Sequence, residues 1–229
     1  MFLVMNPWLW TLSQEIPVLL FFAILPPPDL WPVIGGLGDR LRRAHALDGH
    51  PIGLDRLHIT LAPVFHGSLG LNDIVRRAIA VGDAAIGPAF PARLDKTVSF
   101  GTSRRKPFVL SAGEGLADLA AFQAELCKRL VLAGFDVRGG FTPHMTLVWA
   151  DRHVEEEYPI APISWEVQDF ALICSYQGLS RYEVIRRWRL TPAGPRSSGE
   201  RAGGQIADMA AIARAVPAAA PHQIVPKRR

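Results

Sequence analysis

The chain contains little cysteine, which argues against two common ways of building a site or a scaffold. Cys127 and Cys174 are its only cysteines among 229 residues, and they stand 47 positions apart. This spacing matches no zinc motif, and two cysteines do not make a disulfide framework. We therefore expect a protein of a reducing compartment, the cytoplasm, with both thiols buried as small apolar groups.

The main part of the chain also lacks an excess of charge. The formal net charge is +4, but residues 192–229 hold six basic and two acidic residues, which leaves residues 1–191 with 19 of each. The overall positive charge is therefore no evidence that residues 1–191 bind nucleic acid. Only local clusters such as Arg104-Arg105-Lys106 and Arg186-Arg187-Trp188-Arg189 could form a positive groove. A nucleic-acid binder driven by the tail would depend on six scattered basic residues.

The apolar N-terminus lacks the features of a signal peptide. Asn6, Gln14, Glu15 and two prolines interrupt the first 25 residues, and no basic residue precedes the apolar run. No cleavage pattern of small residues follows it. We expect residues 1–15 to be an extension and residues 18–24 to form a buried first strand, with no attachment to a membrane.

Hydrophobic periodicity divides residues 16–191 into the helices and strands of one α+β domain. Apolar residues recur at helical spacing over residues 35–47, 71–87 and 116–130, although glycines weaken the first of these helices. Strands are predicted at residues 18–24, 56–65, 93–100, 107–111, 145–149, 164–174 and 181–190. This order predicts antiparallel or mixed sheets flanked by helices. Residues 192–229, rich in Ala, Pro, Gly and Arg, predict a disordered basic tail with at most a short helix at residues 206–216.

One short phrase occurs twice in the chain. Leu57-His58-Ile59-Thr60-Leu61 is matched 86 residues later by Pro143-His144-Met145-Thr146-Leu147. Because side chains two apart on a strand share a face, each phrase places a His and a Thr on one side and apolar residues on the other. Two copies arise by chance in roughly one sequence in a thousand. The doubled phrase predicts two similar lobes, each with one buried face and one chemical face.

The residue types of this phrase suit chemistry on a phosphate. Imidazole titrates near neutrality, so one His can hold a proton while the other lacks it, and the two can act as acid and base. A Thr hydroxyl beside each His can donate to a non-bridging phosphate oxygen. A lone His would more simply be a core residue, but two matched pairs favour a site. His66 could join His58 and His144 around a metal, but no carboxylate has a matching spacing, and we predict neither metal nor cofactor.

These residues resemble the signature of the two-histidine phosphoesterase superfamily, in particular its bacterial RNA 2′,3′-cyclic phosphodiesterases, also called 2′-5′ RNA ligases. The resemblance covers residues 16–191 and includes the segments at residues 18–24, 99–110, 141–143 and 175–190. It implies two pseudo-symmetric lobes with the His-x-Thr strands lining the cleft between them. It also implies a metal-independent enzyme that opens 2′,3′-cyclic phosphates at RNA ends or on nucleotides to 2′-phosphates, with reversible 2′-5′ ligation. We expect a monomer that processes RNA in the cytoplasm.

The same resemblance assigns roles to the paired residues. His58 is the general acid that protonates the departing ribose oxygen, His144 is the general base that activates water, and the two roles exchange in the reverse direction. Thr60 and Thr146 complete the catalytic set. For substrate binding, Arg105 can reach a phosphate, and Phe141 or Tyr182 can stack on a base, although packing would explain each of them as well.

One position departs from the family pattern. Many relatives carry Arg five positions after the second His, where this chain has Trp149, and Arg105 or Arg152 could replace the lost phosphate contact. On an undistorted strand Trp149 shares the face of Met145 and Leu147, so we expect it in the core. If the strand bulges, the ring reaches the cleft instead and can stack on a base.

Two other functions fit the same residues. One is hydrolysis of another small phosphodiester, such as a 2′-5′ oligonucleotide or a cyclic phosphate on an ADP-ribose derivative. The other is a module that binds a nucleotide or an RNA end without turnover. The two intact His and Thr pairs favour an enzyme, because binding alone does not require both imidazoles.

Overall fold

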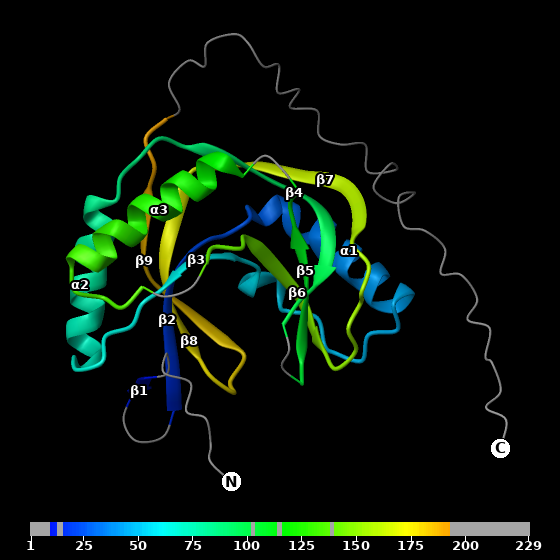
Figure 1. Cartoon of the computed structure of the whole chain (residues 1–229), viewed down its shortest axis with the longest axis horizontal. Helices are drawn as coiled ribbons and strands as arrows, with labels where there is room; N and C mark the ends of the chain where they lie inside the picture. Colours follow the sequence, from blue (N-terminus) through cyan, green and yellow to red (C-terminus); the bar gives the residue numbers. More distant parts are fainter. Residues whose placement is uncertain (1–9, 13–15, 102–103, 114–115, 138–139, 193–229) are drawn as a thin grey trace, which may run out of the picture.

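One antiparallel sheet organises the computed structural model, which describes residues 10–12, 16–101, 104–113, 116–137 and 140–192 (Figure 1). Eight of its nine described strands follow one another in the order β7, β4, β5, β6, β3, β2, β8 and β9, and β1 pairs with the side of β2. The strands are β1 (Trp10–Leu12), β2 (Ile16–Ile24), β3 (Ile59–Pro63), β4 (Phe90–Ser99), β5 (Lys106–Ser111), β6 (His144–Ala150), β7 (Tyr158–Val167), β8 (Asp169–Tyr176) and β9 (Arg181–Arg189). The helices are α1 (Trp31–Ala44), α2 (Leu71–Ala84) and α3 (Ala117–Leu132), with short 3₁₀ turns at Pro28–Leu30 and Leu54–Arg56.

The predicted α+β class, with antiparallel strands flanked by helices, is confirmed. The single strand expected at residues 164–174 is wrong, because β7 ends at Val167 and β8 begins at Asp169. β7 pairs with β4, whereas β8 pairs with β2 in the other half of the sheet. Only Gln168 separates the two strands, and no Gly or Pro marks the change of neighbour. Residues 10–12, expected in an extension, add a short strand to β2.

The sheet divides into two halves at its centre. β3 and β6 pair through Ile59 and Met145. Farther along β6, its pairing partner is the loop that precedes β3. There Pro51 forms a bridge with Val148, and the Ile52 amide donates to the Leu147 carbonyl at 2.8 Å. One half is β7-β4-β5-β6 and the other is β3-β2-β8-β9, so each inner strand carries one copy of the doubled phrase.

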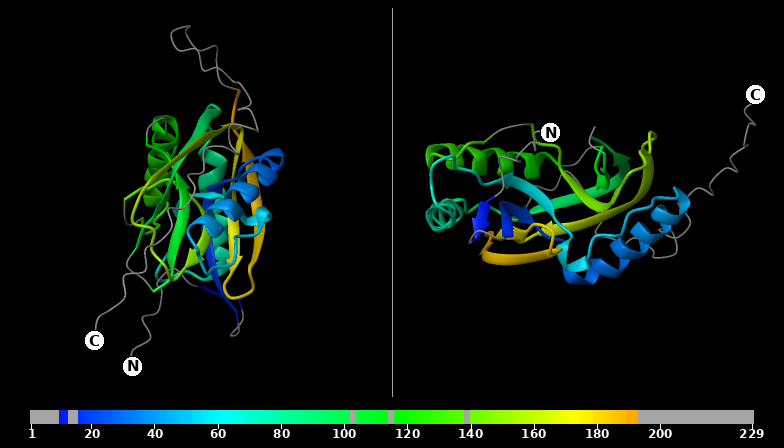
Figure 2. Two further views of the ribbon diagram at one scale, coloured as in Figure 1. Left: turned by 90° about the vertical axis from the view of Figure 1, so that its right-hand side faces the viewer. Right: turned by 90° about the horizontal axis from the view of Figure 1, so that it is seen from below.

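The helices cover the sheet from two sides. α1 contacts β6, α3 contacts β3 and β4, and α2 lies beside α3 and contacts β8 and β9. α1 lies on the opposite side of the molecule from α2 and α3 (Figure 2). None of the helices in the described ranges is both long and apolar enough to cross a membrane.

A stack of aromatic rings ties α2 to the C-terminal strand. The rings of Phe170 and Trp188 stack with centroids 5.1 Å apart, and Trp188 Nε1 donates to Asp83 at 2.7 Å. Gly82 leaves room for this indole, because a Cβ there would come within 2.3 Å of it. After β9, the Thr191 amide donates to the Gly87 carbonyl at 2.8 Å. The tail predicted from residue 192 onward lies, apart from its first residue, outside the described residues.

Candidate active site

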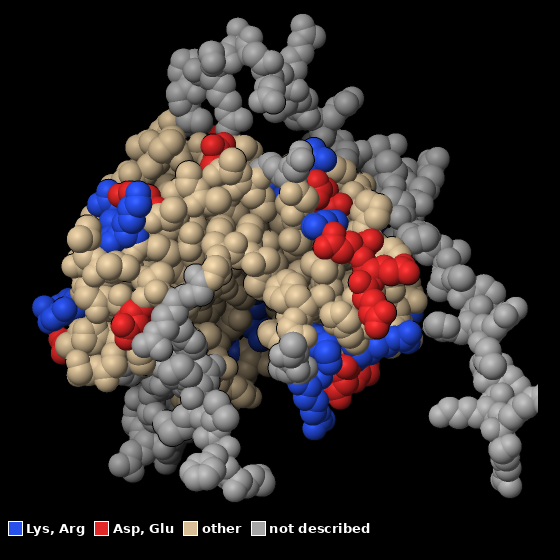
Figure 3. All heavy atoms as spheres, viewed as in Figure 1, with Lys and Arg blue, Asp and Glu red and all other residues tan. Residues whose placement is uncertain are grey.

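The pairing of Ile59 with Met145 places the two copies of the phrase side by side. In an antiparallel ladder this register sets His58 opposite Thr146 and Thr60 opposite His144. Ile59 and Met145 are fully buried on the core face, so the four polar side chains lie on the other face. Each of the four is partly buried. Figure 3 shows that the surface is hollowed between the two halves of the molecule.

The two imidazoles are held in the same way. Nδ1 of His58 donates to the Arg56 carbonyl at 2.7 Å, and Nδ1 of His144 donates to the Thr142 carbonyl at 2.7 Å. A carbonyl oxygen can only accept, so Nδ1 carries the proton in each ring. Nε2 is then the atom that each ring presents for proton transfer.

Burial lowers the pKa of both imidazoles. The pKa of His58 falls to about 4, chiefly because burial disfavours the imidazolium, with smaller contributions from His144 and Arg56 nearby. The hydrogen bond to the Arg56 carbonyl opposes this shift. Burial likewise lowers the pKa of His144, against the effect of its bond to Thr142. Both rings are therefore neutral at pH 7, and a bound phosphate anion would raise both pKa values.

Aromatic rings contact both imidazoles and contribute to their burial. The Phe21 ring lies 5.0 Å from that of His58, the Tyr182 ring lies 5.4 Å from it, and the two rings contact each other at 5.7 Å. The Phe100 ring meets His144 edge-on at 4.7 Å. The sequence analysis identified Tyr182 but missed Phe21 and Phe100. Phe21 lies on β2, next to the first His-x-Thr strand, and Phe100 follows β4, two strands from the second. Aromatic residues on neighbouring strands are the signal that could have identified them.

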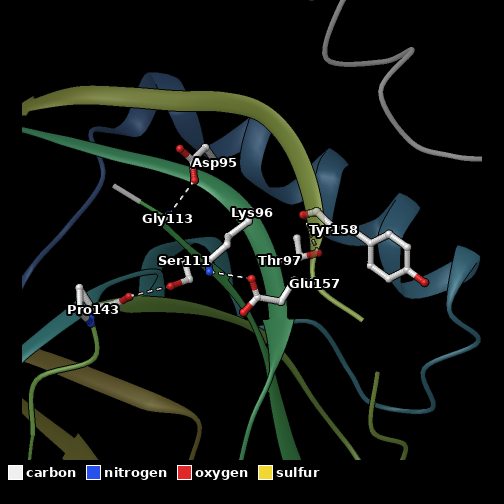
Figure 4. Close-up of polar contacts among 8 residues, drawn as sticks. All are labelled: Asp95, Lys96, Thr97, Ser111, Gly113, Pro143, Glu157 and Tyr158. Atoms are coloured by element: carbon white, nitrogen blue, oxygen red, sulfur yellow. Dashed lines mark hydrogen bonds and ion pairs between the residues drawn. The ribbon is translucent and has the colours of Figure 1, made fainter. Parts of the chain in front are cut away.

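Polar contacts from β4 and β5 fix the backbone that leads to the second phrase (Figure 4). Ser111 pairs with His144 in the strand register, and its hydroxyl donates to the Pro143 carbonyl at 3.2 Å. Lys96, opposite Ser111 on β4, donates to Glu157 at 2.7 Å. The first contact fixes the residue before β6 to β5, and the second fixes the segment before β7 to β4.

Trp149 is not a core residue, contrary to the expectation from strand alternation. Phe108 pairs with Val148 and the next residue of β5 pairs with Thr146, so Leu147 is an extra residue that forms a bulge. The faces of β6 exchange at this point. Val148 is 2% exposed, whereas Trp149 is 43% exposed and lies on the face of Thr146. Leu147 is also the residue whose carbonyl binds the loop before β3.

The structure places the other predicted binding residues at three different positions. Tyr182 is beside His58. Arg105 donates to the Trp149 carbonyl at 2.7 Å and lies 3.7 Å from Asp151, at the far end of β6. Phe141 is partly buried and packs against the core before the second phrase.

The second basic run has structural contacts. Arg186 pairs with Asp83 at 2.9 Å, and Arg187 pairs with Asp169 at 2.7 Å. Trp188 is buried, and the Arg186 guanidinium lies 5.8 Å from the centre of its ring.

His66 lies apart from the two paired histidines. Its Nδ1 accepts from the Ser68 amide at 3.3 Å, and its ring contacts Phe135 at 6.3 Å. Within the described ranges, no three His, Cys, Asp or Glu side chains are grouped in a way that could hold a metal ion.

A family model decides the relationship of the chain. The model of the 2′-5′ RNA ligase superfamily matches residues 26–178, about two thirds of the sequence. The chain belongs to the 2′-5′ RNA ligase superfamily. The predicted relationship to two-histidine phosphoesterases is thereby confirmed, together with a phosphoesterase fold.

Solved structures share the fold of this superfamily member. A crystal structure of a phosphoesterase is 27% identical, with a TM-score of 0.59, over 76% of this chain and 99% of that one. LigT of E. coli complexed with 3′-AMP is 26% identical, with a TM-score of 0.58, over 77% and 99%. The Thermus thermophilus protein TT0787 shares the fold alone. It is 22% identical, with a TM-score of 0.59, over 77% of this chain and 100% of that one. A comparison with curated proteins finds no match.

Proposed function

We propose that this superfamily member is a metal-independent phosphodiesterase that opens 2′,3′-cyclic phosphates at RNA ends or on nucleotides and leaves a 2′-phosphate. The observation that carries the proposal is the matched support of the two imidazoles, which both bind a carbonyl through Nδ1 and present Nε2. The crystal structures of E. coli LigT with 3′-AMP and with ATP support a nucleotide as the class of ligand.

The reaction requires one neutral and one protonated imidazole. Nε2 of His144 takes a proton from water, the water oxygen attacks phosphorus, and the bond from phosphorus to O3′ breaks. Nε2 of His58 then gives its proton to the departing O3′. The hydroxyls of Thr60 and Thr146 donate to the non-bridging oxygens, where negative charge grows in the transition state. A 5′-hydroxyl of a second RNA end in place of water would yield a 2′-5′ linkage.

The bound substrate extends over the same face of the sheet. Tyr182 stacks on a base near His58, and Trp149 supplies a second aromatic surface farther along β6. Arg105 faces a backbone phosphate at that end, and Phe141 borders the approach to His144. The described residues of one chain supply all four catalytic side chains, which supports a monomer. The free thiols of Cys127 and Cys174 agree with RNA processing in the cytoplasm.

Product identification tests this proposal. Purified protein in chelator is incubated with 2′,3′-cyclic nucleotides, an RNA with a cyclic phosphate end and 2′-5′ oligonucleotides. We expect 2′-phosphate products from the first two, with the activity lost in His58→Gln and retained in the control His66→Gln. Turnover of the 2′-5′ oligonucleotides alone would indicate another phosphodiesterase, and binding without turnover would indicate a module that only holds its ligand.

A further inference from the structure

We propose that Arg56 binds the phosphate of the substrate and supplies the fixed positive charge of this site. The inference rests on the proposed function, because it concerns the anion that the two imidazoles act on. The four predicted catalytic side chains carry no fixed charge at pH 7, since both rings are neutral and the other two groups are hydroxyls. A phosphodiester anion entering a partly dry site requires a cation.

The backbone and the side chain of Arg56 both belong to the surroundings of His58. Its carbonyl accepts the hydrogen bond that orients the imidazole at 2.7 Å. Its guanidinium carbon lies 5.6 Å from the centre of the Tyr182 ring, and that ring lies 5.4 Å from the imidazole of His58. The positive charge of the guanidinium is also the smallest of the causes that lower the pKa of His58, after burial and His144.

The charge of Arg56 is available to a ligand. Among the described residues, no carboxylate forms an ion pair with it, and its side chain is partly buried. Other arginines of the sheet have such partners, for example Arg187 with Asp169 and Arg186 with Asp83. A guanidinium above an aromatic ring keeps its N–H edge for a phosphate, which it can bind through two parallel hydrogen bonds.

This arrangement couples phosphate binding to protonation of His58. A phosphate bound to Arg56 neutralises the positive charge of the guanidinium, which disfavours a protonated His58. The negative charge of the phosphate also favours the protonated form directly. Arg56 therefore replaces, on the His58 side of the site, the phosphate contact that an arginine at the position of Trp149 would make. The sequence analysis missed Arg56 because it stands before the phrase, in the 3₁₀ turn Leu54–Arg56.

Binding of inorganic phosphate and turnover of a 2′,3′-cyclic nucleotide test the inference together. We expect Arg56→Met to weaken phosphate binding and to raise KM by about tenfold or more, with Arg56→Lys in between. The matched control is Arg181→Met, because Arg181 also lies over a tyrosine ring, that of Tyr176 at 4.5 Å, in the β8–β9 hairpin that carries Tyr182. Unlike Arg56, Arg181 pairs with a carboxylate, Glu183 at 3.6 Å. The control should keep the wild-type Kd and KM.

Two spectroscopic measurements separate phosphate binding from a structural role. In the wild-type protein, added phosphate should shift the NMR signal of the Arg56 Nε–H, a result that needs no variant. In Arg56→Met, the pKa of His58 should rise, because a nearby positive charge has been removed. Unchanged phosphate binding in folded Arg56→Met, or a wild-type protein that binds no phosphate, would overturn the inference. Absence of turnover in a wild-type protein that binds phosphate through Arg56 would instead contradict the proposed function alone.

Discussion

At the scale of single residues, the two histidines have the same support and different neighbours. Each ring donates through Nδ1 to the carbonyl two positions before it. His58 lies among Phe21, Tyr182 and Arg56, whereas His144 faces Phe100 at the end of β4. Identical support with unequal surroundings lets the two rings hold different numbers of protons in the same complex, as acid and base must.

The buried His58 makes the fold sensitive to acid. Its pKa is about 4 in the folded protein and about 6.5 when unfolded, so between these values the unfolded chain binds a proton that the folded chain does not. The free energy of unfolding should fall by about 3 kcal/mol from pH 7 to pH 4 on this account. Denaturant titrations at several pH values should show a smaller fall in His58→Gln than in the control His153→Gln, and an equal fall in both would contradict the assignment.

The exposed Trp149 should matter for substrate and little for stability. Trp149→Ala is expected to raise KM for RNA with a cyclic phosphate end, because a stacking surface is lost. Its effect on stability should be far smaller than that of Trp188→Ala, which removes a ring that is 6% exposed and should cost about 3 to 5 kcal/mol. Thermal melts and kinetics on both variants make the comparison. A strongly destabilised Trp149→Ala with an unchanged KM would show that the ring packs instead of binding.

At the scale of elements, periodicity predicted most helices and strands but not their interruptions. The helical spacing of residues 71–87 and 116–130 corresponds to α2 and α3, because an apolar stripe must face a sheet. The bulge at Leu147 and the division of the run at residues 164–174 depend on partners far away in sequence. No Gly or Pro marks either of them, so alternation alone placed Trp149 on the wrong face.

The packing of α2 on β9 gives a test at this scale. Gly82→Val would bring a side chain against the Trp188 indole, which is stacked on Phe170 and cannot move away without cost. We expect a loss of about 1 to 3 kcal/mol in the free energy of unfolding. Gly67→Ala is the control, because nothing lies within 4 Å of a Cβ there. Urea denaturation should leave the control within about 0.5 kcal/mol of the wild type, and equal stability of both variants would contradict this packing.

At the scale of the whole molecule, the site lies where the two halves of the sheet meet. The doubled phrase predicted the two halves, because two similar strands with one polar face each can share that face. The catalytic role of the four residues that meet there stays a prediction. The sequence could not predict that a single residue pair, Ile59 with Met145, joins these strands, since register depends on the surrounding packing. It also could not predict which aromatic rings close the site.

The tail should be dispensable for the domain. The last backbone contacts of the described chain are those of Thr191 with the segment at residues 87–89, and β9 ends before them. Deletion of residues 194–229 should leave the melting temperature and the turnover of a small cyclic nucleotide unchanged. Because the tail holds six basic residues, the largest effect we expect from its deletion is weaker binding of longer RNA, and this effect should depend on salt concentration. If the truncated protein does not fold, the domain extends beyond the predicted boundary at residue 191.

The most direct test of the central claim is the pH dependence of kcat/KM in chelator, for the wild type and for His58→Ala, His144→Ala and the double variant. We predict a bell-shaped profile with its maximum below pH 6.5, because burial lowers both imidazole pKa values and the active form holds one proton. Each folded single variant should lose about 10² to 10⁴ in turnover, and the double variant should lose much less than the product. A folded single variant with nearly wild-type turnover would contradict the claim, as would activity that disappears in chelator and returns with one divalent ion.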